Sequence, residues 1–182
     1  MRILGVDPGT HRLGFGVLDV ESDTAQCLEW GCLEAGRSQP IHERLHLLHQ
    51  ELRAVVERWR PDHLAVEEPF VATERGAKSA VAVGQAQAVA LLLAAEAGME
   101  VHRYAPTQVK RAVGDYGAST KGHLQRVVQR VLGLEPGPMP EDASDALAVA
   151  LCHVHLWGAS QRVQKAQSSQ RPRQAPSSRG QA

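Results

Sequence analysis

Cysteines and long apolar runs are both scarce in this sequence. Its three cysteines, Cys27, Cys32 and Cys152, lack a Cys-x-x-Cys spacing, so a disulfide framework and a cysteine-based zinc site are not expected. The main apolar stretch, residues 89–95, is too short to span a bilayer, and the first residues do not have the shape of a signal peptide. These absences favour a protein of the reducing cytoplasm with no membrane contact.

A net charge is also missing, because 20 basic residues balance 20 acidic ones. The balance is uneven along the chain: residues 161–182 hold five basic residues and no acid, which leaves 15 bases against 20 acids in residues 1–160. The excess of acidic residues in 1–160 is explained if several carboxylates share bound cations. The basic end either binds nucleic acid or is merely solvated, and its composition fits both readings.

The spacing of apolar residues predicts an α/β fold. Three closely spaced strands favour an antiparallel meander, and the later strands alternate with helices, as parallel crossover strands do. Strands are predicted at residues 2–6, 13–20, 27–33, 64–66 and 101–104, and helices at 41–59, 76–97, 107–113, 121–132 and 141–157. The result is a mixed five-stranded sheet flanked by helices in one domain, residues 1–158, followed by a disordered basic tail, residues 159–182.

Acidic residues stand where these predicted elements end. Asp7 closes the first strand and Glu67 the fourth, while Asp142 and Asp145 share one face near the start of the last helix. If the two strands are neighbours and the helix crosses them, all four carboxylates converge. Hard oxygen ligands of this kind select Mg²⁺ or Mn²⁺. Each acid also has an ordinary reading, as a turn former or as a favourable charge in a first helical turn.

The ordered set of motifs resembles the RuvC family of Holliday-junction resolvases, within the ribonuclease-H-like superfamily. The matching segments are residues 3–10 (ILGVDPGT), 64–70 (LAVEEPF), 84–86 (GQA), 108–110 (QVK) and 142–148 (DASDALA). The resemblance implies a ribonuclease-H-like fold and a Mg²⁺-dependent endonuclease, with two ions in each active site and Mn²⁺ as a possible substitute. It also implies that Asp7, Glu67, Asp142 and Asp145 are the metal ligands, and that the products carry 5′-phosphate and 3′-hydroxyl ends.

Further residues and partners are implied by the same resemblance. Lys110 and Lys121 are expected to contact phosphate beside the metals, where an ammonium offsets charge. Phe70, with Arg75 and Lys78 nearby, is expected to stack on an unpaired base of the DNA. The expected partners are a four-way DNA junction, a second copy of the chain in a homodimer, and the branch-migration proteins RuvA and RuvB. The helix at 76–97 is either the dimer face or a helix buried in the monomer.

Three rival functions remain to be weighed. An ATP-binding domain of the actin type shares the Asp-x-Gly-Thr turn at residues 7–10 but needs a second phosphate loop that this chain does not provide. A YqgF-type nuclease that processes RNA shares the Asp-x-Gly start. A non-catalytic junction-binding module is disfavoured because all four acids are present.

Other conspicuous residues have structural interpretations. His42, His46 and His49 share a helical face that should be remote from the acids, and His153 and His155 are interpreted as ordinary helix residues. The segment Gly14-Phe15-Gly16 within a strand is interpreted as a place of close backbone packing.

Overall fold

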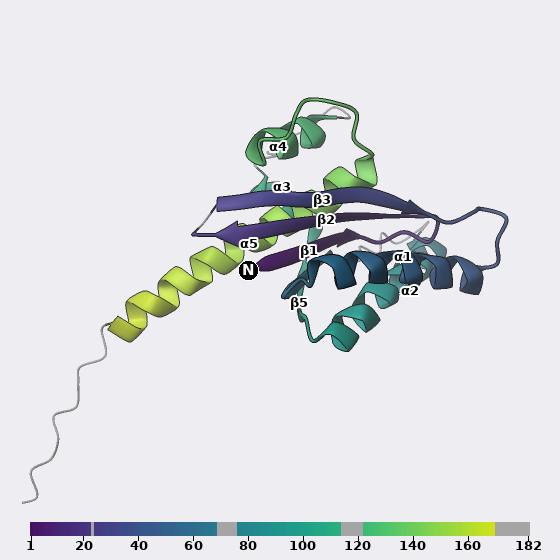
Figure 1. The fold of residues 1–182 in the computed structure, drawn as a ribbon, viewed down its shortest axis with the longest axis horizontal. Helices are drawn as coiled ribbons and strands as arrows, with labels where there is room; N and C mark the ends of the chain where they lie inside the picture. Colours follow the sequence, from purple (N-terminus) through teal and green to yellow (C-terminus); the bar gives the residue numbers. More distant parts are fainter. Residues whose placement is uncertain (23, 69–75, 114–121, 170–182) are drawn as a thin grey trace, which may run out of the picture.

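The computed structural model describes residues 1–22, 24–68, 76–113 and 122–169, and the side chains of 76–79 and 161–169 are outside this description. A mixed sheet forms its centre, with helices on both faces (Figure 1). The five strands are β1 (Arg2–Asp7), β2 (Arg12–Glu21), β3 (Thr24–Glu34), β4 (His63–Glu67) and β5 (Glu100–Tyr104). Their order is β3-β2-β1-β4-β5, with β1, β2 and β3 antiparallel and β1, β4 and β5 parallel. The predicted meander and crossover strands are confirmed.

Helices cover the two faces of the sheet unequally. They are α1 (Ile41–Trp59), α2 (Gly76–Ala97), α3 (Pro106–Ala112), α4 (His123–Val131) and α5 (Glu141–Ser169). One apolar core joins the sheet to α1 and α2, and a second core joins the opposite face to α3, α4 and α5. Neighbouring residues of β1 illustrate the division, since Ile3 faces α5 whereas Leu4 faces α1 and α2.

Helix α5 lies directly on the sheet because β1 and β2 present glycines to it. A Cβ atom on Gly5 would overlap the carbonyl oxygen of Ala146, and one on Gly14 would overlap the carbonyl of Asp142. Gly14 is also the pairing partner of Asp7 across β1 and β2. The prediction of close backbone packing at this segment is confirmed, and the packing places the first turn of α5 beside the end of β1.

The length of α5 corrects the predicted helix end. The sequence predicted an end at Trp157 and disorder from residue 159, but the helix continues to Ser169 and its last turns run beyond the sheet (Figure 1). Residues 159–169 are polar, yet they are rich in Ala, Gln, Lys and Arg and contain neither Gly nor Pro, so they favour a helix without needing a core. Residues 170–182 lie outside the described part, and their disorder stays a prediction.

Helix α2 is more exposed than the expected, largely buried helix. By length and composition its residues Ala80–Ala97 could cross a membrane, and only 33% of this segment is buried. One side, which includes Val89 and Leu93, packs into the core with α1. The other side leaves Val81 61% exposed and Leu92 60% exposed.

The glycine packing generates a first prediction. Gly14→Ala should force the first turn of α5 away from β2 and lower the free energy of unfolding by about 1–3 kcal/mol, as overpacking does. A thermal melt would then show a loss of about 2–4 °C for each kcal/mol in a chain of this size. Gly84→Ala is the matched control, because a Cβ there meets no atom of the described residues within 4 Å and Ala is the better helix former. Equal melting temperatures for Gly14→Ala and the native chain would contradict this packing.

Candidate active site

Asp7 and Glu67 lie side by side at one edge of the sheet. They end the adjacent parallel strands β1 and β4, in which Val6 pairs with Val66. Residues 3, 5 and 7 of β1 alternate onto the face covered by α5, as do residues 63, 65 and 67 of β4. Both carboxylates therefore point to the side of the sheet on which α5 begins.

Asp142 and Asp145 complete the group from the first turns of α5. That helix begins where the carbonyl oxygen of Pro140 accepts the N–H groups of Ala143 and Ser144, each at 3.1 Å. Burial and the neighbouring acids raise the pKa of Asp145 to about 6, with Glu141, Glu67 and Asp142 acting in that order. The predicted convergence of strand ends and helix start is therefore present in the structure.

Asp7 experiences the strongest perturbation in the group. Burial is the largest cause, followed by the charges of Asp145, Asp142, Glu67 and Glu141 in that order, and together they raise its pKa to about 7. Burial also raises the pKa of Glu67, while the nearby Lys110 acts in the opposite direction. Carboxylates that are buried together cannot all ionise at neutral pH unless a cation compensates them.

The Gln-Val-Lys segment explains how Lys110 reaches this edge. The Oε1 atom of Gln108 accepts the backbone N–H of Ala105 at 2.8 Å and so closes the start of α3. Val109 is buried in the core beneath α3 and α5, and Lys110 is exposed beside Glu67. The motif thus supplies a side chain that closes the start of α3, a buried residue that packs the helix into the core, and a cation beside the acids.

Two residues that hold the acids in place were not predicted from the sequence. The Nε atom of Arg12 lies 3.0 Å from Oδ2 of Asp142, so one oxygen of this acid has a positive partner on β2. The buried Gln87 of α2 donates from Nε2 to the carbonyl oxygen of Glu67 at 3.0 Å. A polar side chain on the apolar face of a helix is the signal that could have identified Gln87, because a buried amide needs a partner.

Several predicted DNA-contacting residues cannot be placed. Phe70, Arg75 and Lys121 lie outside the described residues, as does the side chain of Lys78. His42, His46 and His49 lie on α1, which covers the opposite face from α5. The interpretation of these three as remote from the acids is confirmed.

A different group of histidines has the tightest metal-ligand geometry in the described part of the chain. His63, His102 and His153 bring three donor nitrogens within 4.8 Å of one another. The acids form no group of three that is equally tight among the residues described. His153, interpreted as ordinary from the sequence, belongs to a buried polar cluster.

Comparisons with known proteins find similar sequences along most of the chain. The family model described as "Crossover junction endodeoxyribonuclease RuvC" matches residues 3–153. A protein of that name from Chloroflexus aurantiacus is 44% identical over 162 residues, covering 89% of this chain and 98% of the relative. One from Desulfitobacterium hafniense is 41% identical over 155 residues, covering 85% and 93%.

Solved structures extend the likeness to three dimensions. The structure described as "T. thermophilus RuvC in complex with Holliday junction substrate" superimposes with a TM-score of 0.79 at 35% identity, covering 88% of this chain and 96% of that one. A fowlpox virus resolvase has the same fold at a TM-score of 0.55, with 11% identity and coverage of 86% and 99%. The predicted ribonuclease-H-like fold is confirmed.

The raised pKa values predict how stability depends on pH in the metal-free protein. Asp ionises near 3.8 when unperturbed, whereas Asp7 holds its proton to about 7 in the fold. Between these values the folded state binds more protons than the unfolded state, so the free energy of unfolding falls as pH rises through this window. Asp7→Asn should remove much of this fall and melt above the native chain at neutral pH in a chelator.

Calorimetry in EDTA at about pH 5 and about pH 8 measures this difference. Glu57→Gln, on the exposed side of α1, is the control and should follow the native profile. If the native chain and Asp7→Asn lost stability equally between the two pH values, Asp7 would not be the buried, proton-holding acid described above.

Proposed function

Because this chain belongs to the RuvC family of crossover junction endodeoxyribonucleases, we propose that it resolves Holliday junctions in recombination and DNA repair. It would hydrolyse one phosphodiester on each of two symmetry-related strands. The products would carry 5′-phosphate and 3′-hydroxyl ends. The observation that supports this most is the convergence of Asp7, Glu67, Asp142 and Asp145 at one edge of the sheet, with Lys110 beside them.

The acids have the right chemistry to hold two Mg²⁺ ions, with Mn²⁺ as a substitute. Their donors are hard oxygens. Burial, and after it the neighbouring acids, raises the pKa values of Asp7 and Asp145, and bound divalent cations would offset both effects. Two bound ions would supply a nucleophilic hydroxide and stabilise the leaving oxygen. Asp7 and Asp145 would be the central ligands in this arrangement. Asp142 would exchange part of its contact with Arg12 for a metal.

Lys110 would hold a phosphate of the scissile strand. It is exposed and lies near enough to Glu67 to lower the pKa of that acid. An ammonium in this position attracts the DNA backbone and offsets charge as the reaction proceeds. Lys121, Phe70, Arg75 and Lys78 are proposed as further DNA contacts on the strength of the family resemblance, with Lys121 also at the catalytic centre.

Two symmetry-related cuts imply a dimer with C2 symmetry. The exposed side of α2 supports its use as the dimer face, because Val81 and Leu92 are eleven residues apart and so fall on one stripe of the helix. Gln85 and Ala88 lie between them on the same exposed stripe. An apolar stripe of this kind suits an isologous contact between two copies. RuvA and RuvB are proposed as partners, and the cytoplasm as the location.

Cleavage of synthetic substrates tests the proposal. With Mg²⁺, the native chain should place paired nicks in a four-way junction and leave linear duplex and structured RNA intact, and EDTA should stop the reaction. Asp7→Asn and Asp145→Asn should each lower the cleavage rate about 100-fold or more while junction affinity stays within a few fold, because removing charge stabilisation at a reacting centre costs at least that much.

Glu57→Gln is again the matched control and should cut at the native rate. Preferential cleavage of RNA would instead favour the YqgF-type activity. Junction binding without cleavage in any divalent metal would favour a non-catalytic binding module. Either result would overturn the proposed function.

The salt dependence of junction binding tests the role of Lys110. Lys110→Gln in an Asp145→Asn background should weaken junction binding and reduce the slope of log affinity against log salt by about 0.9, the value for one lost phosphate contact on duplex DNA. Arg53→Gln is the control, because Arg53 lies on α1 and pairs with Glu96 on the opposite face of the sheet. An unchanged slope in Lys110→Gln would remove this residue from the DNA-binding surface.

A further inference from the structure

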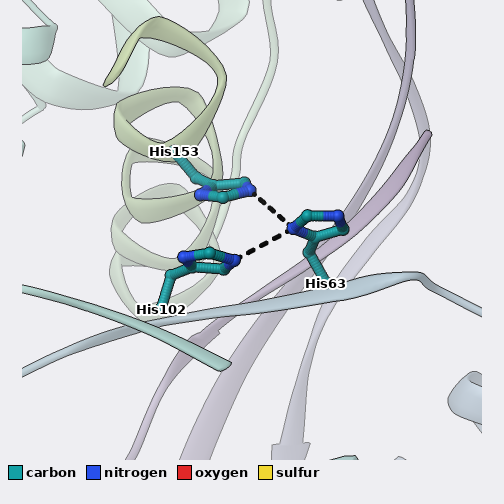
Figure 2. Close-up of side chains that lie close together, drawn as sticks. All are labelled: His63, His102 and His153. Carbon is teal, nitrogen blue, oxygen red and sulfur yellow. Dashed lines mark hydrogen bonds between the residues drawn. The ribbon is translucent and has the colours of Figure 1, made fainter. Parts of the chain in front are cut away.

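Three histidines from three elements meet at the end of the sheet away from the acids. His63 begins β4, His102 lies within β5, and His153 lies on α5 (Figure 2). His63 and Glu67 are four positions apart on β4, a span of about 13 Å at the usual rise of a strand. Asp145 and His153 are eight positions apart on α5, a span of about 12 Å. The histidine cluster is therefore distinct from the carboxylate site.

The contacts among these rings converge on a single atom. Nδ1 of His63 lies 3.0 Å from Nε2 of His102 and 3.1 Å from Nε2 of His153, as the dashed lines of Figure 2 show. A ring nitrogen either donates one proton or accepts one. Nδ1 of His63 therefore cannot make two full hydrogen bonds at once. Three converging nitrogens of this kind are better satisfied by a cation placed between them.

Two of the three nitrogen–nitrogen distances are close to those around a tetrahedral metal ion, and all three nitrogens lie within 4.8 Å of one another. Zn–N bonds of about 2.0–2.1 Å at tetrahedral angles place neighbouring ligand nitrogens about 3.3–3.4 Å apart. The two contacts of Nδ1 in His63, 3.0 and 3.1 Å, are a few tenths of an ångström shorter. Imidazole is a preferred ligand of Zn²⁺, and Zn²⁺ has no geometric demand that three histidines and one further ligand fail to meet.

The residues around the cluster favour neutral, oriented imidazole rings, which is the form that binds a metal. The hydroxyl of Tyr104 lies 2.6 Å from Nδ1 of His153, the outer contact that fixes the orientation of a ligating ring. His153 is fully buried, and burial together with the neighbouring His102 and His63 lowers its pKa to about 3, so it is neutral and able to ligate at physiological pH. Burial also lowers the pKa of His102. Protons would not compete strongly with a metal for either ring.

Glu100 could supply a fourth ligand, and Trp157 shields one side of the cluster. Oε1 of Glu100 lies 3.3 Å from Nε2 of His102, and the side chain is largely exposed, so this carboxylate or a water would complete four-coordination around a bound ion. The Trp157 ring packs against the histidines, with centroid distances of 5.0 Å to His63 and 5.3 Å to His102. The cluster is thus shielded on the α5 side and accessible beside Glu100.

We propose that His63, His102 and His153 form a Zn²⁺ site that fastens α5 to β4 and β5. The ion would be structural, and it would link the elements that carry Glu67, Asp142 and Asp145 at their other ends. Binding to the folded state alone stabilises that state by mass action. With free Zn²⁺ about 100-fold above its dissociation constant, the melting temperature should rise by about 5–10 °C.

Metal titration of the full chain, prepared without a histidine tag, tests this site. The background is Asp7→Asn with Asp145→Asn, which removes carboxylate ligands and any dependence on nuclease activity. Co²⁺, used as a spectroscopic substitute for Zn²⁺, should bind with one tight equivalent per chain and give the intense visible bands of tetrahedral coordination. Zn²⁺ should displace it and raise the melting temperature.

Variants locate the bound ion. His102→Gln, at a partly exposed position, should lose the tight equivalent, the tetrahedral spectrum and the Zn²⁺-dependent rise in melting temperature. His155→Gln, two residues from His153 on the exposed side of α5, and His46→Gln, on α1, should keep all three. A background chain with no tight equivalent or no tetrahedral spectrum would overturn the proposal. So would a His102→Gln variant that binds Co²⁺ as the background does, and both comparisons stand whether or not the chain cuts junctions.

Discussion

The arrangement of the structure depends on several acidic side chains that are buried close together at one edge of the sheet. Asp7, Glu67 and Asp145 all have raised pKa values, and the largest cause for each is burial rather than a neighbouring charge. A site of this kind costs stability in the absence of cations, because ionised carboxylates repel one another and lose hydration. Bound divalent metals would offset this cost, which also makes the acids poor candidates for a purely structural role.

Close backbone packing makes this concentration of charge possible. The acids come from two strands and a helix, and they meet because glycines at positions 5 and 14 let α5 approach β1 and β2 with no side chain between them. The surrounding core then fixes the approach, since Ala146 and Leu147 of α5 are completely buried. Electrostatics and packing are therefore coupled: a change that lifts α5 also separates Asp145 from Asp7.

Much of this arrangement could be predicted from local sequence, and the remainder could not for physical reasons. The periodicity of apolar residues gave α1 and α2 their observed bounds, and strand ends gave Asp7 and Glu67. The end of α5 was wrong because polar helix formers continue a helix without a core. The histidine cluster was missed because its three members are far apart in sequence and share no spacing, so only the fold brings them together. The contact of Arg12 with Asp142 was missed for the same reason.

The central claim is that the carboxylates at the ends of β1 and β4 and at the start of α5 form one divalent-metal centre. Crystals of the chain soaked in Mn²⁺ and measured for anomalous scattering test it most directly. The account predicts two anomalous peaks about 3.5–4 Å apart, both within bonding distance of oxygens from Asp7 and its neighbours. Ordered Mn²⁺ elsewhere on the molecule with none beside Asp7 would contradict it.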